Sequence, residues 1–189
     1  MSWRAAILAI GLGLGLCGCA VNEIAAPEPV LDDVQIVRAE GLPSMNVGDF
    51  TPGPGAPTGM DKSIMARAGV DPAPGGSFAK FLGDTLAAQL RAAGRLDPNS
   101  DLVVTGLITD THLATEQATS DGRLAARFTL SRKGQVVFEK TFAVKDAWDS
   151  DFVGSVAIPD AFNHYAALFP KLVTALLTDP EFQAAAKSD

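Results

Sequence analysis

Hydrophobic residues recur at helical spacing in the middle of the chain and again near its end. After Ser77, apolar side chains three or four residues apart form one helical face. These are Phe78, Phe81, Leu82, Leu86, Leu90 and Ala93. Ser77 can cap this helix at its start, and Gly94 suits the left-handed position just beyond its end. The pattern therefore predicts a helix over residues 78–93.

A second helix is predicted after Asp160, which is a candidate N-cap. Its apolar face consists of Phe162, Tyr165, Phe169, Leu172, Val173 and Leu176. Pro170 falls inside this pattern, so we expect it to kink the helix or split it in two. A last short helix is predicted after Asp179, with Pro180 at its first position and Phe182 packing back on the domain.

Strand patterns lie between these helices. Residues 102–108 are apolar on both faces, which is typical of a central strand, and the strand can continue through Leu113. Residues 124–130 and 136–144 alternate between apolar and polar or small side chains, which predicts a hairpin.

The same alternation predicts the register of this hairpin. A three-residue loop over 132–134 brings the apolar residues of both strands onto one face, whereas a two-residue loop at 133–134 does not. The longer loop also places Gly134 where a left-handed residue is needed. We therefore predict the three-residue loop, which pairs Leu130 with Val136, Phe128 with Phe138 and Leu124 with Phe142.

Residues 33–76 are expected to be irregular. Their last 36 positions hold six prolines and eight glycines, a density that excludes a long helix. Short elements are predicted within the segment: strands at 34–37 and 45–50, and a helix at 61–68. A long irregular segment of this kind is either a functional element or a mobile surface arm.

The order of these elements is strand, helix, strand, hairpin and helix. It predicts an α+β domain of two layers, a mostly antiparallel sheet of about four strands with two main helices on one face. The core of this domain is expected over residues 77–189, after the irregular segment 33–76.

The first 18 residues resemble a secretory signal peptide. Arg4 precedes an uncharged apolar run over 5–16, which is too short to span a bilayer. The sequence Leu16-Cys17-Gly18-Cys19 resembles a bacterial lipobox, which implies cleavage before Cys19 and acyl chains on its thiol and on the new amino terminus. Cys17 is a poorer acceptor, because Leu16 precedes it where a small residue is wanted. An ordinary signal peptide and an N-terminal membrane helix are the alternatives.

This resemblance also implies a location. Residues 19–32 are then the lipidated cysteine and a tether, and two or three acyl chains anchor a protein firmly. Ala20 stands where Asp retains many Gram-negative lipoproteins at the inner membrane. We therefore expect a protein that is lipid-anchored at the outer membrane and faces the periplasm.

Composition and motifs exclude several classes of function. The net charge of −7 is unfavourable for nucleic-acid binding, which depends on neutralising phosphates. His112 and His164 each stand alone, and the acidic residues over 146–160 lack calcium-loop spacing. Ser77 lacks the Gly-x-Ser-x-Gly pattern of a nucleophile elbow. We expect no metal, no cofactor and no catalytic residue.

Three aromatic residues are candidates for a partner surface. Trp148 and Phe152 lie in a connection predicted over 148–159, and Phe50 lies in the irregular segment. If exposed, such side chains are anchors for a protein or acyl partner. If buried, they close the core of the domain.

From about residue 75 to residue 182 the chain resembles a group of poorly characterised proteobacterial outer-membrane lipoproteins. The resemblance rests on Gly75-Gly76-Ser77-Phe78-Ala79, Ala92-Ala93-Gly94-Arg95-Leu96-Asp97, Trp148 with Phe152-Val153-Gly154, Ala157-Ile158-Pro159 and Asp179-Pro180-Glu181-Phe182. These motifs are structural rather than catalytic. More loosely, the chain resembles small periplasmic α/β lipoproteins that serve as accessory subunits in lipopolysaccharide assembly, lipid transport or peptidoglycan synthesis.

Two hypotheses of function follow. The first is an accessory or docking subunit, anchored through Cys19, that binds a protein of a cell-envelope machine. The second is a lipid or glycolipid binder with an apolar cleft lined by Phe81, Phe128, Phe138, Phe142 and Phe169, although these side chains can equally fill a core.

Overall fold

The computed structural model describes residues 24–54, 59–115 and 118–188, and within them it shows an α+β domain. The main sheet has four strands in the order β1-β4-β5-β6, and a smaller sheet is formed by β2 and β3. Strand β1 is parallel to β4, and the other pairs are antiparallel. The strands are β1 (Asn46–Pro52), β2 (Ser63–Ala66), β3 (Gly69–Pro72), β4 (Leu102–Ala114), β5 (Thr119–Arg132) and β6 (Gln135–Asp149). The predicted fold class is thus confirmed, with a mixed sheet.

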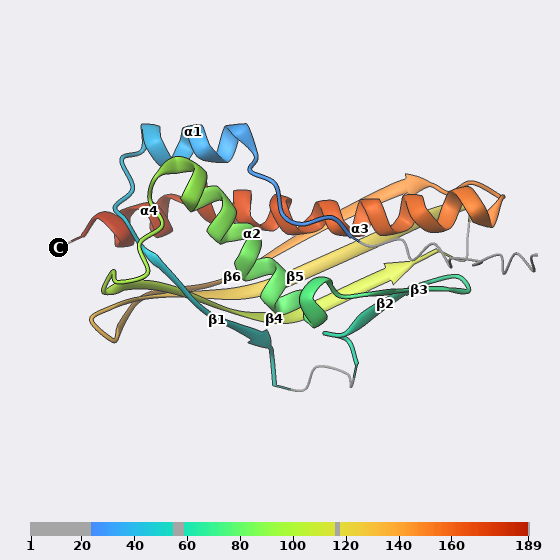
Figure 1. Cartoon of the computed structure of the whole chain (residues 1–189), viewed down its shortest axis with the longest axis horizontal. Helices are drawn as coiled ribbons and strands as arrows, with labels where there is room; N and C mark the ends of the chain where they lie inside the picture. The colour runs from blue at the N-terminus through green and yellow to red at the C-terminus, as the bar shows by residue number, and fades with distance from the viewer. Residues whose placement is uncertain (1–23, 55–58, 116–117, 189) are drawn as a thin grey trace, which may run out of the picture.

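Two long helices cover one face of the main sheet (Figure 1). Helix α2 (Phe78–Ala93) packs on β1 and β4, and α3 (Gly154–Leu177) packs along β5 and β6. Two short helices, α1 (Leu31–Ala39) and α4 (Pro180–Lys187), and the one-turn η1 (Pro74–Gly76) complete the described elements. The core lies between the helices and the sheet, where Tyr165 and Phe169 of α3 meet Phe78 of α2.

The predicted ends of α2 and α4 are confirmed. The Ser77 hydroxyl accepts a hydrogen bond from the Lys80 backbone N–H, and Gly94 ends α2 with a φ of 73°. The Asp179 carboxylate accepts from the Phe182 backbone N–H, with Pro180 at the first position of α4. Local capping chemistry is therefore sufficient to define these boundaries.

Helix α3 begins earlier than predicted. It starts at Gly154, so Asp160 lies inside the helix and is not its N-cap, and Pro170 does not split it. Proline cannot donate to the carbonyl four residues earlier, but this loss is opposed by the burial of ten α3 side chains. Tertiary packing therefore keeps the helix continuous across both Pro159 and Pro170.

The loop of the β5–β6 hairpin is also not the one predicted. The turn has two residues, Lys133 and Gly134, both with positive φ, and not three. Val137 forms a bulge, because Leu130 pairs with Phe138 while Ser131 pairs with Val136. Because of the extra residue, the apolar side chains of β6 from Phe138 onwards lie on the same face as those of β5, so the shared face is right for these residues although the predicted pairs are wrong. Val136, which the prediction also placed on that face, pairs with Ser131 and is 63% exposed.

The segment before α2 contains more regular structure than predicted. The strand at 45–50 is confirmed as part of β1, but residues 34–37 belong to α1, where Asp33, Val34 and Val37 are buried on one side. Residues 63–66 form β2 instead of a helix. These residues are extended because they pair with β3. The prediction was wrong because a pattern of four residues is too short to distinguish a strand from a helical turn.

The predicted tether over 19–32 is partly packed on the domain. Ile24 is buried, the Val30 backbone N–H donates to Gln89 Oε1 at 2.7 Å, and Gln89 Nε2 donates to the Glu28 carbonyl at 3.3 Å. The buried Gln89 of α2 thus fixes residues 28–30. Only the residues before Ile24 remain for the tether, and these lie outside the described residues.

Burial raises the pKa of the Asp33 carboxyl, a rise that the facing Thr174 hydroxyl only partly offsets and that Asp32 increases. A group whose pKa is raised by folding favours the folded state at low pH and destabilises it as pH rises. Asp33→Asn is therefore expected to raise the free energy of unfolding by about 1 kcal/mol at pH 8 and to change it little at pH 4. Urea unfolding at both pH values, with the exposed Asp49→Asn as control, tests this. Equal effects of Asp33→Asn at the two pH values would contradict it.

Candidate functional site

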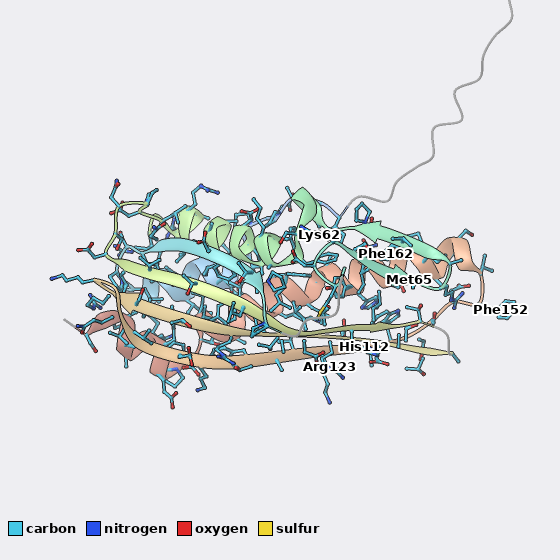
Figure 2. All side chains as sticks on the ribbon, turned by 90° about the horizontal axis from the view of Figure 1, so that it is seen from below. Lys62, Met65, His112, Arg123, Phe152 and Phe162 are labelled. Atoms are coloured by element: carbon cyan, nitrogen blue, oxygen red, sulfur yellow. The ribbon has the colours of Figure 1, made fainter. Side chains whose placement is uncertain are left out.

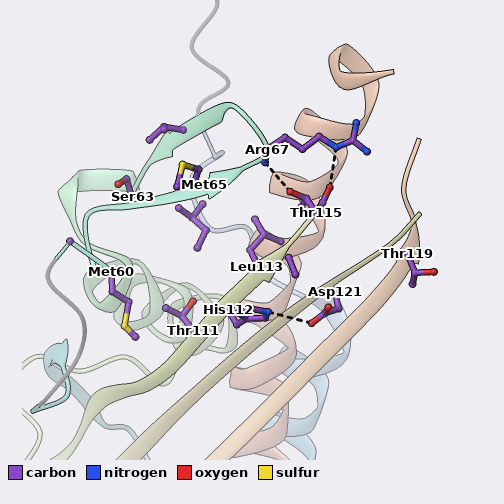
Figure 3. A pocket seen from close by; sticks show the side chains of 14 residues that line it. Met60, Ser63, Met65, Arg67, Thr111, His112, Leu113, Thr115, Thr119 and Asp121 are labelled. Atoms are coloured by element: carbon purple, nitrogen blue, oxygen red, sulfur yellow. Dashed lines mark hydrogen bonds and ion pairs between the residues drawn. The ribbon is translucent and has the colours of Figure 1, made fainter. Parts of the chain in front are cut away.

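A groove of about 870 Å³ lies between the β2–β3 hairpin and the second half of β4 (Figure 3). On one side it is lined by residues 111–114 of β4 and by Thr115, which follows the strand. On the other side it is lined by Met60 and by Ser63, Ile64, Met65 and Val70 of the hairpin.

The β4 edge in this groove is not paired with another strand in the described part of the chain. Strand β1 pairs with β4 only as far as Ile108, whose carbonyl also accepts from Gly53 N–H at 2.8 Å. At Thr109 the pairing of β4 with β5 is interrupted by a bulge. Beyond it, residues 110–114 pair with β5 alone. Five of the thirteen residues of β4 thus form an open strand edge that lies in a groove.

Side chains from both faces of β4 line the groove. The Thr111 hydroxyl lies 2.7 Å from the Tyr165 hydroxyl, and Leu113 packs against the cluster that contains Phe162, so both point towards α3. His112 points to the opposite face, where its Nε2 lies 3.8 Å from Asp121 Oδ2. Because side chains from both faces of β4 line the groove, the groove runs along the edge of this strand. The backbone N–H and C=O groups of a strand point to that edge.

The β2–β3 hairpin packs one face on the domain and exposes apolar side chains on the other. Ala66 is buried and Ile64 packs against the core, which fixes β2 to the domain. Met65 and Val70 form a cross-strand pair and are 63% and 61% exposed. The site therefore combines an open backbone edge with adaptable apolar side chains.

Arg67 closes one end of the groove. Its backbone, with a φ of 52°, turns between β2 and β3, and its N–H donates to Thr115 Oγ1 at 2.9 Å. Its Nε donates to the Thr115 carbonyl at 3.0 Å, and its Nη2 donates to the Asp151 carbonyl at 2.7 Å and to Ser150 Oγ at 3.0 Å. One side chain thus joins the hairpin, the end of β4 and the β6–α3 connection.

Arg67→Ala is expected to lower the free energy of unfolding by about 2 kcal/mol, because several charge-assisted hydrogen bonds are lost at a half-buried position. Backbone amides of β2 and β3 should exchange faster with solvent than those of β5. Urea unfolding and hydrogen exchange measure both effects. Arg127→Ala, an exposed change on β5, is the control, and equal losses in the two variants would contradict the role of Arg67.

Trp148 is a buried residue and not an exposed anchor. Its side chain is 9% exposed and stacks on the His164 ring at 4.2 Å with an interplanar angle of 1°. His164 Nδ1 lies 2.9 Å from Asp146 Oδ2, to which Lys171 also donates, and these two contacts lower the pKa of Asp146. The Trp148–His164 pair therefore has a structural role in joining β6 to α3.

The other two aromatic candidates lie elsewhere. Phe50 is partly buried between α2 and the sheet, with its ring 6.0 Å from that of Phe128. Phe152 is 97% exposed and projects at the start of α3 (Figure 2). The structure does not bring the three candidates into one patch. The groove residues Met65, Arg67 and Thr115 were not predicted from the sequence.

Within residues 24–54, 59–115 and 118–188, no group of three or more His, Cys, Asp or Glu side chains is placed to hold a metal ion. In the same ranges, no helix is long and apolar enough to cross a membrane. The predicted lipidation site Cys19 lies outside the described residues.

Comparison with known proteins reveals similarity at the level of fold. No family model and no curated protein matches the chain. The protein XCC0632 from Xanthomonas campestris, of the family-model DUF330, superposes with a TM-score of 0.54 at 15% identity, covering 86% of this chain and 94% of that one. This likeness shows that the two chains share an α+β fold.

Two weaker similarities are to lipoproteins. A putative lipoprotein from Caulobacter crescentus gives a TM-score of 0.45 at 11% identity and covers 82% of this chain and 99% of its own. A minor lipoprotein from Acinetobacter baumannii gives 0.44 at 11% identity and covers 75% and 94%.

Proposed function

We propose that this protein is a lipid-anchored, non-catalytic lipoprotein of the cell envelope that docks an extended segment of a partner protein in the groove. The observation that carries the proposal is the edge of β4 over 110–114, which pairs with no other strand among the described residues and faces an apolar hairpin wall. The proposal is of the accessory-subunit class.

The chemistry of an open strand edge favours an extended segment as the binding partner. A row of backbone N–H and C=O groups is best satisfied by a second extended backbone, which adds to the sheet as a further strand. Main-chain hydrogen bonds supply affinity in this mode, and side-chain pockets supply specificity. Met60, Met65 and Val70 would receive alternate side chains of the added segment.

The polar groups of the groove support binding rather than catalysis. The 3.8 Å separation of His112 Nε2 from Asp121 Oδ2 is too long for a hydrogen bond. Thr115 Oγ1 already accepts from Arg67. The described residues therefore offer no nucleophile held against a base in the groove.

The lipid anchor rests on the resemblance of residues 16–19 to a lipobox. Acyl chains on Cys19 would hold the domain at a membrane, and Ala20 favours the outer membrane with the domain in the periplasm. The alternative of a lipid carrier has less support, because Phe81, Phe128, Phe138 and Phe169 are buried in the core and Phe142 packs against it.

A matched pair of substitutions tests the docking site. Met65 in the groove and Val136 at the distant β5–β6 turn are both 63% exposed, so arginine at either position should be tolerated by the fold. Met65→Arg is expected to abolish co-purification of the envelope partner from detergent extracts, whereas Val136→Arg leaves it unchanged. The melting temperatures of both variants should match that of the unchanged protein. Retention of the partner by Met65→Arg would overturn the groove as the docking site.

A further inference from the structure

The proposed anchor is joined to the domain by a short segment of chain. Residues 28–30 are fixed on α2 and Ile24 is buried, so at most the residues from Cys19 to Ile24 separate the proposed anchor from the domain. Five residues span at most about 18 Å when fully extended. A lipidated Cys19 would therefore hold the surface around Ile24 close to the bilayer.

The start of α3 lies within reach of this anchor. Ile24 lines a hollow of about 350 Å³ together with Phe81 of α2 and Asn163 of α3. Gly154, the first residue of α3, precedes Asn163 by nine positions, which corresponds to about 14 Å along a helix. A membrane that receives the acyl chains can thus also contact this end of the helix.

This end of the molecule exposes apolar side chains. Phe152 is 97% exposed, Val153 54% and Val156 53%, and we call these three residues the apolar tip. Figure 2 shows Phe152 projecting away from the body of the domain. The backbone of the tip is held in place, because Asp151 Oδ1 accepts from Val153 N–H at 2.7 Å and Arg67 donates to the Phe152 carbonyl at 3.3 Å.

We propose that the apolar tip inserts into the headgroup region of the membrane that carries the lipid anchor. The inference rests on the acylation of Cys19 in the proposed function. An exposed aromatic ring beside two valines gains free energy by leaving water at an interface. The exposed carboxylates of Asp149 and Asp151 flank the tip, so a surface of zwitterionic phospholipid suits it better than an anionic one.

The tip and the tether together define the orientation of the domain. The start of α3 and the β5–β6 turn lie at opposite ends of the molecule in Figure 1. With the tip on the membrane, the turn at Lys133 and Gly134 points away from it. Arg67 joins the hairpin to the connection that bears the tip, so the groove is held near the membrane surface.

Fluorescence quenching in vesicles tests this orientation on the full mature protein. Acylated protein is reconstituted into vesicles of phosphatidylethanolamine and phosphatidylcholine whose acyl chains are brominated. A polarity-sensitive fluorophore is placed on a cysteine introduced by Val153→Cys or, as the matched control, by Val136→Cys. Because Cys17 is cleaved off and Cys19 is acylated, the introduced thiol is the one that reacts.

The expected result is a blue-shifted emission at position 153, quenched several-fold more strongly by brominated chains than the fluorophore at position 136. Adding Phe152→Asp, a change at a fully exposed position, should remove the quenching at 153 without changing the acyl mass. Equal quenching at 153 and 136, or none at 153, overturns the inference while the proposed function stands. Absence of acyl mass on Cys19 refutes the anchor itself, and the inference fails with it.

Discussion

Replacing Cys19 with serine is expected to move the protein entirely from the membrane fraction to the soluble fraction. A serine hydroxyl does not replace the thiol that receives the diacylglycerol, and the apolar run over 5–16 is too short to act as a stable span. Two or three acyl chains anchor a protein firmly, whereas three exposed apolar side chains at the tip would alone bind a bilayer only weakly. Cell fractionation and intact-mass spectrometry measure the result.

Cys17 provides the matched control, because it lies two residues earlier in the same motif. Cys17→Ser is expected to leave the acyl mass and the membrane fraction unchanged. Acyl chains carried by Cys17, or membrane retention of Cys19→Ser, would contradict the assigned lipidation site.

Replacing Gly106 with alanine is expected to lower the free energy of unfolding by about 3 kcal/mol, as overpacking of a rigid site does. A methyl group on this β4 residue would overlap the Phe50 ring, and one on Gly83 of α2 would lie 2.9 Å from the same ring. The two glycines therefore make the space in which Phe50 packs. Urea unfolding gives the change directly.

Two further variants separate overpacking from a general cost of alanine. Gly154→Ala, where the added methyl would have ordinary contacts, is expected to be neutral or slightly stabilising. In the Phe50→Ala background, Gly106→Ala should cost much less than in the natural chain. An equal cost in both backgrounds would contradict the packing role of Phe50.

Features governed by local chemistry could be predicted from the sequence. Ser77 and Gly94 define the ends of α2 through caps that need only their immediate neighbours. The strand through Leu113 and the apolar face of the β5–β6 hairpin were also predictable from alternation. The bulge at Val137 was not, because it depends on Lys133 adopting a positive φ that a non-glycine residue rarely adopts.

The candidate site depends on contacts between distant segments. The groove arises because β1 ends opposite Ile108 while β4 continues to Ala114, a mismatch visible only once their register is known. One sequence signal pointed to an unpaired edge. The strand predicted at 102–108 can continue through Leu113, whereas the strand predicted at 45–50 is short. Arg67 lies in a segment rich in Pro and Gly that carries no periodic pattern, so its bridging role could not be predicted.

The burial of Trp148 also depends on distant packing. Alternation continues through residue 148 because β6 extends to Asp149, and this places the indole against His164 of α3. Phe152, four residues later, lies beyond the strand and before the helix, where nothing covers it among the described residues. Two neighbouring aromatic residues of similar sequence context thus have opposite environments.

Photo-crosslinking in living cells tests the docking groove most directly. A photoreactive amino acid is placed at position 65 in one strain and at the equally exposed position 136 in another. We expect position 65 to crosslink to one short segment of a single envelope protein, mapped by mass spectrometry, and position 136 not to crosslink to that segment. The same adduct from both positions, or none from position 65, would contradict docking in the groove.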